Sequence, residues 1–206
     1  RLALALEGEQ RFTANAAHEL LTPLAAIKTE VQLCQLQLGD ERGAVMLDRI
    51  AQRVDRASHT VSQLLTLARL DPEQPLTFRR LCLDSLLSEA LADTAHLADQ
   101  RGLTLAMEAA AGVYISGSEE SLAILLRNLL INAFRYAAAG TTVAIQLLAG
   151  ECVQLQIANE CPPLSKQEFS RICERFYRAP GAVGQGSGLG LSIVARVAKQ
   201  HGARLS

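Results

Sequence analysis

The sequence is poor in aromatic residues and contains no tryptophan: phenylalanine and tyrosine make up 4% of its 206 residues. Hydrophobic residues still account for 49% of the chain, and leucine and alanine are abundant among them. Both combine high helix propensity with apolar surface, so helix packing is expected to supply most of the buried area. The length fits one or two domains with cores of their own.

No charge of one sign predominates, because 20 Lys and Arg residues stand against 21 Asp and Glu residues, for a net charge of −1. Neither sign forms a dense block, which argues against a nucleic-acid partner and against direct membrane contact by this segment. No run reaches the roughly 18 apolar residues of a membrane span, and the start has no signal-peptide layout. A membrane anchor is therefore expected outside this segment.

The cysteines form no CxxC pair and no metal-ligand spacing with the four histidines. This argues against a zinc site and against a disulfide framework. Free thiols in a cytosolic setting are predicted for all five, namely Cys34, Cys82, Cys152, Cys161 and Cys173.

Two long stretches carry apolar or small residues at steps of three and four, residues 12–38 and 46–68. This spacing predicts two helices, the first ended by Gly39 and Asp40 and the second before Pro72. A short connection makes them an antiparallel hairpin whose apolar seam is only partly covered. Pairing with a second copy into a four-helix bundle would cover it, so a homodimer is predicted.

A second domain is predicted to begin at Pro72, which divides the chain into residues 1–71 and 72–206. Its mixture of helices and hairpin strands predicts an α+β domain with helices on one face of a sheet, whose final hairpin is expected beyond Ser206. The expected strands are 76–81, 103–106, 142–148 and 152–158, and the expected helices are 83–101, 119–137, 168–173 and 189–201.

His18 lies off the apolar stripe of the first helix, among small side chains. Glu19 can accept a hydrogen bond from one ring nitrogen and leave the other as a nucleophile. Thr22, one turn on, offers a hydroxyl that can position water, and Pro23 should loosen the helix beside His18. The alternative from the residues alone is an ordinary surface histidine.

In the helix expected at 119–137, Asn128, Asn132 and Arg135 recur at four and three residues and share a face, with Tyr136 beside them. An Asn oxygen can bind Mg²⁺ and an Arg can neutralise phosphate charge. A capped surface helix is the alternative. The buried side of this helix is predicted to hold Leu122, Leu125, Leu129 and Ala133.

A glycine-rich turn at Gly186, Gly188, Leu189 and Gly190 leads directly into a predicted helix. Glycines let the backbone approach a phosphate, and the free N–H groups of a helix start favour anions. By itself such a turn is more often a plain loop.

Four segments resemble, in order, the motifs of bacterial two-component sensor histidine kinases. Residues 12–24, with the run from His18 to Leu24, resemble the H-box, whose family form is HELRTPL. Residues 127–136 resemble the N-box, 173–178 the F-box and 186–191 the second glycine box. The chain resembles most the quorum-sensing and polymyxin-resistance group of these kinases.

The resemblance implies a dimeric helical hairpin followed by an α/β-sandwich ATP-binding domain of the histidine kinase, Hsp90 and gyrase type. It implies ATP-dependent phosphorylation of His18, an acid/base role for Glu19, and transfer to an Asp in the receiver domain of a response regulator. Thr22 would act in dephosphorylation of that partner, and Asn132 would contact Mg²⁺. It also implies a mobile ATP lid near 177–185 and a full-length protein in the bacterial inner membrane.

The sequence departs from the family at the first glycine box, DxGxG, where it reads Asn159 to Pro163. Asn159 can still present a carbonyl oxygen to adenine, but Cys161 and Pro163 replace both glycines and predict an altered, weaker pocket. Leu21 replaces an Arg beside His18, which bears on partner docking. The alternative hypothesis is therefore a signalling module with a degenerate pocket that acts by docking or by dephosphorylating its regulator.

Overall fold

The chain folds into two compact units, Arg1–Asp71 and Pro72–Ser206. The structure is a computed structural model, and it describes residues 21, 24–34, 41–70, 77–180 and 186–206. No helix within these ranges has both the length and the hydropathy of a membrane span.

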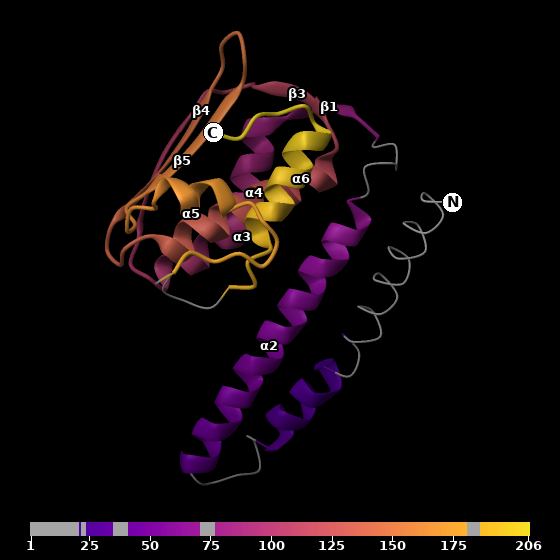
Figure 1. The fold of residues 1–206 in the computed structure, drawn as a ribbon, viewed down its shortest axis with the longest axis vertical. Helices are drawn as coiled ribbons and strands as arrows, with labels where there is room; N and C mark the ends of the chain where they lie inside the picture. Colours follow the sequence, from indigo (N-terminus) through magenta and orange to yellow (C-terminus); the bar gives the residue numbers. More distant parts are fainter. Residues whose placement is uncertain (1–20, 22–23, 35–40, 71–76, 181–185) are drawn as a thin grey trace. The chain divides into compact units, whose positions relative to one another are not determined.

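The N-terminal unit contains a helix over residues 24–34 and the long helix α2, Glu41–Arg69 (Figure 1). The two helices are joined by an ion pair of 2.5 Å between Lys28 Nζ and Asp55 Oδ1. Val54, from the predicted stripe of α2, is buried, whereas Met46 of the same stripe is 67% exposed. Part of the apolar stripe of this hairpin is therefore open to solvent.

The C-terminal unit is an α+β domain, as predicted, with its long helices on one side of a sheet (Figure 1). In the three-stranded sheet, β4 lies between β2, which is parallel to it, and β5, which is antiparallel. β1 and β3 form a separate antiparallel pair. The strands are β1 Arg79–Cys82, β2 Thr104–Ala109, β3 Tyr114–Gly117, β4 Thr142–Leu148 and β5 Gln154–Asn159. The helices are α3 Leu83–Asp99, α4 Glu119–Tyr136, α5 Lys166–Arg171 and α6 Gly190–Gln200.

Helix α4 lies at the centre of the helical layer and contacts α3, α6 and β5. Its most deeply buried side chains are Leu126, Leu130 and Phe134, each 1% exposed or less. Of the four residues predicted for the buried side, Leu122 and Ala133 are buried, Leu125 is half-buried and packs against the core, and Leu129 is only half-buried. Because α4 is packed against α3, α6 and β5, it buries a broader face than a single stripe, and its most buried residues differ from those that the stripe predicts.

Strand β4 follows the pattern expected of a half-buried strand. Val143, Ile145 and Leu147 alternate with more exposed residues and are themselves 1% exposed or less. Alternation with a period of two residues places these three side chains on the face covered by the helices.

Some element boundaries differ from the predicted ones. β1 begins at Arg79 rather than at residue 76, and the four-residue strand β3 was not predicted, because so short a segment carries no clear alternation. Helix α5 begins at Lys166, two residues before the predicted start. A capping box between Ser165 and Glu168 sets its start. Hydrogen bonds from Ser165, of which that from its side chain has the largest effect, lower the pKa of the Glu168 carboxyl.

All five cysteines are free thiols, as predicted. In the described part of the chain, no group of three or more His, Cys, Asp or Glu side chains is placed to hold a metal ion.

Asp84, near the start of α3, accepts hydrogen bonds from three donors. They are the Cys82 thiol at 2.9 Å and the backbone N–H groups of Gly112 and Val113, both at 3.1 Å. These hydrogen bonds lower the pKa of Asp84 from its ordinary value of 3.8, and the bond from Cys82 has the largest effect. The carboxylate thus ties α3 to the turn before β3.

A carboxyl group with a lowered pKa in the folded state stabilises that state above its unfolded pKa, and this contribution is lost as pH falls through the folded pKa. We expect Asp84→Asn to be less stable than the wild type at neutral pH and to lose less stability on acidification. Thermal unfolding followed from neutral to acidic pH measures both. Parallel curves for the two proteins would contradict the role given to this carboxylate.

Candidate nucleotide-binding site

Three of the predicted site residues share one side of α4, opposite its buried line. Asn128, Asn132 and Arg135 are all half-buried there. The Asn128 side-chain nitrogen donates to the carbonyl oxygen of Ile124 at 2.8 Å, one turn earlier. This bond fixes the orientation of the Asn128 amide, so the face presents amide groups and a guanidinium together.

The glycine-rich segment approaches the C-terminal end of this face. A Cβ at position 186 would lie 3.1 Å from Nη1 of Arg135 and 3.4 Å from the hydroxyl oxygen of Tyr136. Residue 186 therefore lies against both side chains, and a larger residue would press on them. The fold thus brings together Arg135, Tyr136 and Gly186, which lie about 50 residues apart in the sequence.

Gly188 contacts Phe176, so the two ends of the intervening loop lie side by side. The N–H of Phe176 donates to the carbonyl oxygen of Gly188 at 2.9 Å. Gly188 has φ +71°, and a Cβ there would lie 2.7 Å from the backbone carbon of Phe176. Phe176 itself has φ 62°, which is rare outside glycine. Both ends of the loop are thus held by one backbone contact that only glycine permits at position 188.

We expect Gly188→Ala to destabilise the C-terminal unit by about 2–4 kcal/mol, because a left-handed residue with a Cβ costs about 1–2 kcal/mol and the contact with Phe176 adds strain. Gly102→Ala is the matched control, since Gly102 has φ +61° and a Cβ there would meet no atom within 4 Å. Urea unfolding of both variants separates the two contributions. Equal losses in the two variants would mean that the Phe176 contact adds nothing.

Helix α6 follows the glycine turn directly, as predicted. Its N-cap residue, Leu189, is fully buried and makes no side-chain capping hydrogen bond. The Leu189 N–H donates to the Ser187 hydroxyl oxygen at 3.2 Å. The first-turn N–H groups beyond it have no partner within the helix, and such groups attract phosphate.

Asn159 ends β5 and pairs with Val143 of β4. The next residue, Glu160, accepts a hydrogen bond of 2.8 Å from the Ala138 N–H, which joins the strand end to the segment after α4. The Asn159 side-chain nitrogen is buried and has no hydrogen-bond partner among the described residues. An unpaired buried donor is unfavourable, and a ligand that supplies an acceptor would satisfy it.

Arg101 supports this region although no motif or spacing singles it out. Its Nη2 donates to the carbonyl oxygen of Ala137 at 2.7 Å, and Ala137 is the C-cap of α4. The guanidinium thus binds the end of α4 next to Tyr136. A cation near a helix C-terminus is a known stabilising arrangement, but here it comes from 36 residues away and only the fold reveals it.

The phosphoryl-acceptor residues predicted from the sequence, His18, Glu19 and Thr22, lie outside the described residues. Leu21 is helical and half-buried. Residues 181–185 of the predicted lid also lie outside the described part. Cys161 and Pro163 are described, and both are exposed.

The C-terminal unit therefore has the layered α+β fold of an ATP-binding domain of the histidine kinase type, and it brings Arg135 and Tyr136 against Gly186. Comparison with known families agrees. Residues 9–73 match the family described as His Kinase A (phospho-acceptor) domain. Residues 117–206 match the histidine kinase-, DNA gyrase B-, and HSP90-like ATPase family. The chain belongs to the sensor histidine kinase family.

Individual relatives support this assignment. The sensor protein QseC of Escherichia coli O157:H7 is 40% identical over 200 residues, which cover 94% of this chain and 43% of that protein. The sensor protein kinase PmrB of Pseudomonas aeruginosa is 35% identical over 204 residues, with 98% and 43% covered. The chain thus spans less than half the length of these relatives.

Solved structures show the same fold. Full-length ShkA, crystallised with AMPPNP, superposes with a TM-score of 0.73 at 23% identity, over 93% of this chain and 41% of ShkA. The histidine kinase AdeS of Acinetobacter baumannii gives a TM-score of 0.61 at 20% identity, over 89% of this chain and 86% of that chain.

Proposed function

We propose that this chain is the catalytic segment of a sensor kinase that phosphorylates itself on His18 with ATP. The observation that carries the proposal is the convergence of Arg135, Tyr136 and Gly186 beside the start of α6. A positively charged side chain and a helix start at one place suit the phosphates of a nucleotide. The matches to a phospho-acceptor family and to an ATPase family support pairing this site with His18.

The residues present fit ATP and Mg²⁺. The unpartnered amide nitrogen of Asn159 offers a hydrogen bond to a heterocycle acceptor such as a ring nitrogen of adenine. Asn128 and Asn132 would serve the phosphate end, with Asn132 supplying a neutral oxygen to Mg²⁺. When bound, Mg²⁺ supplies charge neutralisation of the phosphates.

The proposed reaction breaks the bond between the γ-phosphorus and the bridging oxygen of ATP and forms a bond from phosphorus to a ring nitrogen of His18. ADP leaves, and Glu19 accepts a hydrogen bond from the other ring nitrogen. The nucleotide site contributes by positioning and by neutralising charge. An Asp of a response regulator receiver domain then takes the phosphoryl group from His18.

Two measurements on the 206-residue chain test the proposal. Calorimetry with Mg-ATP measures binding, and incubation with labelled ATP and Mg²⁺ measures phosphoryl transfer to the protein. Binding together with labelling is the expected result. The absence of both binding and labelling would overturn the proposal.

A second candidate function is favoured by Cys161 and Pro163, which stand where the family's glycines make room for the base. In this alternative the chain is a signalling module with weak or no ATP binding that docks its regulator or dephosphorylates it. The two functions predict opposite results for nucleotide binding, and the unpaired side-chain nitrogen of Asn159 favours the kinase.

For Thr22 we expect substitution with Ala to slow the loss of phosphoryl groups from the regulator without reducing label on His18. The reason is that Thr22 follows His18 by four residues, one turn of the predicted helix, so its hydroxyl can position the attacking water. The measurement is the decay of phosphorylated regulator in the presence of each protein. An unchanged decay rate would remove Thr22 from this role.

We further propose that the N-terminal unit forms a homodimer through a four-helix bundle. Exposed apolar side chains of α2 support this, because Met46 and Val45 are 67% and 56% exposed. Analytical ultracentrifugation of the chain tests the dimer, and a monomer at micromolar concentration would contradict it.

The segment is proposed to lie in the cytoplasm and the full-length protein in the bacterial inner membrane.

A further inference from the structure

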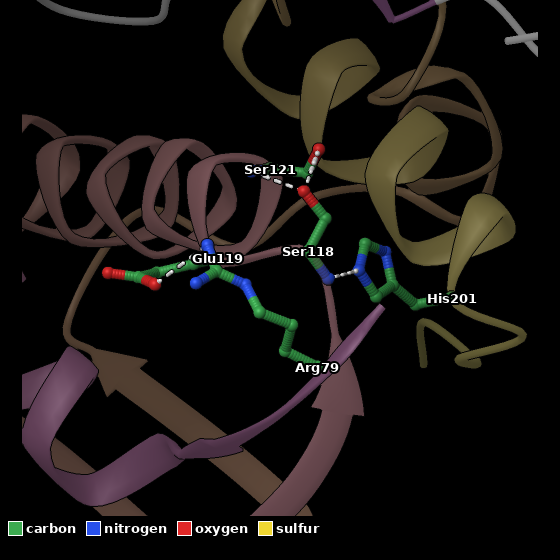
Figure 2. A network of polar contacts seen from close by, with 5 residues as sticks. All are labelled: Arg79, Ser118, Glu119, Ser121 and His201. Atoms are coloured by element: carbon green, nitrogen blue, oxygen red, sulfur yellow. Dashed lines mark hydrogen bonds and ion pairs between the residues drawn. The ribbon is translucent and has the colours of Figure 1, made fainter. Parts of the chain in front are cut away.

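His201, the C-cap residue of α6, contacts three separate parts of the C-terminal unit. Its Nε2 accepts a hydrogen bond of 3.0 Å from the Ser118 N–H, and its Nδ1 lies 2.9 Å from the carbonyl oxygen of Val197. The ring also stacks on Phe78, with centroids 4.9 Å apart and planes inclined by 10°. Figure 2 shows the ring directed at the backbone nitrogen of Ser118.

These contacts define the tautomer of the ring. The Ser118 N–H can only donate, so Nε2 must be unprotonated. The Val197 carbonyl can only accept, so the proton of the neutral ring is on Nδ1. Both nitrogens of His201 are therefore engaged with backbone groups, and the Phe78 ring fixes the plane in which they lie.

The His201 ring packs closely against the backbone at Gly117. A Cβ at Gly117 would lie 3.0 Å from Cδ2 and 3.2 Å from Nε2 of His201. Ser118, next in the chain, is the N-cap of α4, where its hydroxyl oxygen accepts from the Ser121 N–H at 3.4 Å. Beside it, Arg79 and Glu119 form an ion pair of 3.5 Å (Figure 2). The N–H and the side chain of Ser118 thus join His201 to the first turn of α4.

Helices α4 and α6 run in opposite directions, and they are linked at both ends. At one end the last residue of α6 binds the N-cap of α4 through His201 and Ser118. At the other end Gly186, just before α6, lies against Arg135 and Tyr136 in the last turn of α4. A shift of α6 along α4 at the first end would move the glycine turn relative to Arg135 and Asn132 at the second.

We propose that His201 is a positioning residue for the nucleotide site: its Nε2 atom, bound to the Ser118 N–H, sets the position of α6 and its glycine turn along α4. The effect on nucleotide affinity rests on the proposed kinase function, whereas the hydrogen bond itself does not.

Two substitutions separate this link from the local role of the ring. The Gln side chain places an oxygen near the position of Nε2, so His201→Gln keeps an acceptor for Ser118. The shorter Asn side chain can still donate to Val197 but does not reach Ser118. His96→Gln is the matched control, because His96 is exposed in the last turn of α3.

The measurements use the whole chain: Mg-ATP affinity by calorimetry, exchange of the Ser118 amide hydrogen, and the tautomer of His201 by nitrogen NMR. We expect His201→Asn to weaken Mg-ATP by about fivefold, the change that corresponds to one average hydrogen bond. His201→Gln and His96→Gln should stay within about twofold of wild type. Exchange at Ser118 should accelerate in His201→Asn alone.

Equal affinity of wild type and His201→Asn would overturn the proposal, as would a His201→Gln protein as weak as His201→Asn. An Nε2-protonated ring in the wild type would also overturn it. If no protein in the series binds Mg-ATP, the kinase function fails, and the tautomer and the Ser118 exchange rate still decide whether the His201 link exists.

Discussion

Replacing His18 with Gln is expected to reduce label on the protein to background after incubation with labelled ATP and Mg²⁺. A carboxamide nitrogen is not a nucleophile, because its lone pair is delocalised into the carbonyl group. Gln has a high helix propensity and therefore suits the helix predicted there. Label on the wild type should survive alkali and be lost in acid, as a phosphorus–nitrogen bond requires. Mg-ATP affinity should not change, since the proposed nucleotide site lies in the other unit.

The control for this experiment is His96→Gln, which removes an exposed imidazole from α3 and should leave labelling at the wild-type level. Label that persists on His18→Gln would assign the acceptor to another residue. Absence of label from both variants and from the wild type, together with no binding of Mg-ATP, would favour the docking or dephosphorylating module.

Helices and strands could be predicted where apolar residues recur at a regular spacing along the whole element. Helix α4 was expected at 119–137 and is Glu119–Tyr136, and β4 has the expected bounds, Thr142–Leu148. Each carries enough apolar positions at its own spacing to define a face. Strand β3 was missed and α5 was displaced, because four or six residues hold little periodic information and a cap such as Ser165 decides the start.

The contacts that assemble the site could not be predicted from local pattern. Motifs singled out Arg135 and Gly186, but only the fold shows the distance of 3.1 Å between the guanidinium and a Cβ at residue 186. Arg101 and His201 were not predicted at all, since each acts on backbone groups far along the chain. Backbone partners leave no signal in the residue types of the sequence.

We expect Asn132→Ala to weaken Mg-ATP binding by about 100-fold or more, because replacing residues that merely support a metal ligand already costs about 10- to 100-fold. Asn132 is half-buried on the face of α4 that carries Asn128 and Arg135, so removal of its amide leaves the buried line of the helix intact. Calorimetry measures the loss, and ultracentrifugation should show the same dimer as the wild type.

Asn132→Asp distinguishes loss of a ligand from loss of packing. It keeps the shape and an oxygen of the side chain, and Mg²⁺ prefers oxygen ligands, so this variant should bind Mg-ATP more tightly than Asn132→Ala. In the absence of Mg²⁺ the order should reverse, because the carboxylate then repels the phosphates without a cation between them. An unaltered nucleotide affinity in Asn132→Ala would place the phosphates elsewhere, and equal affinities of the two variants with Mg²⁺ would mean that position 132 contributes through packing alone.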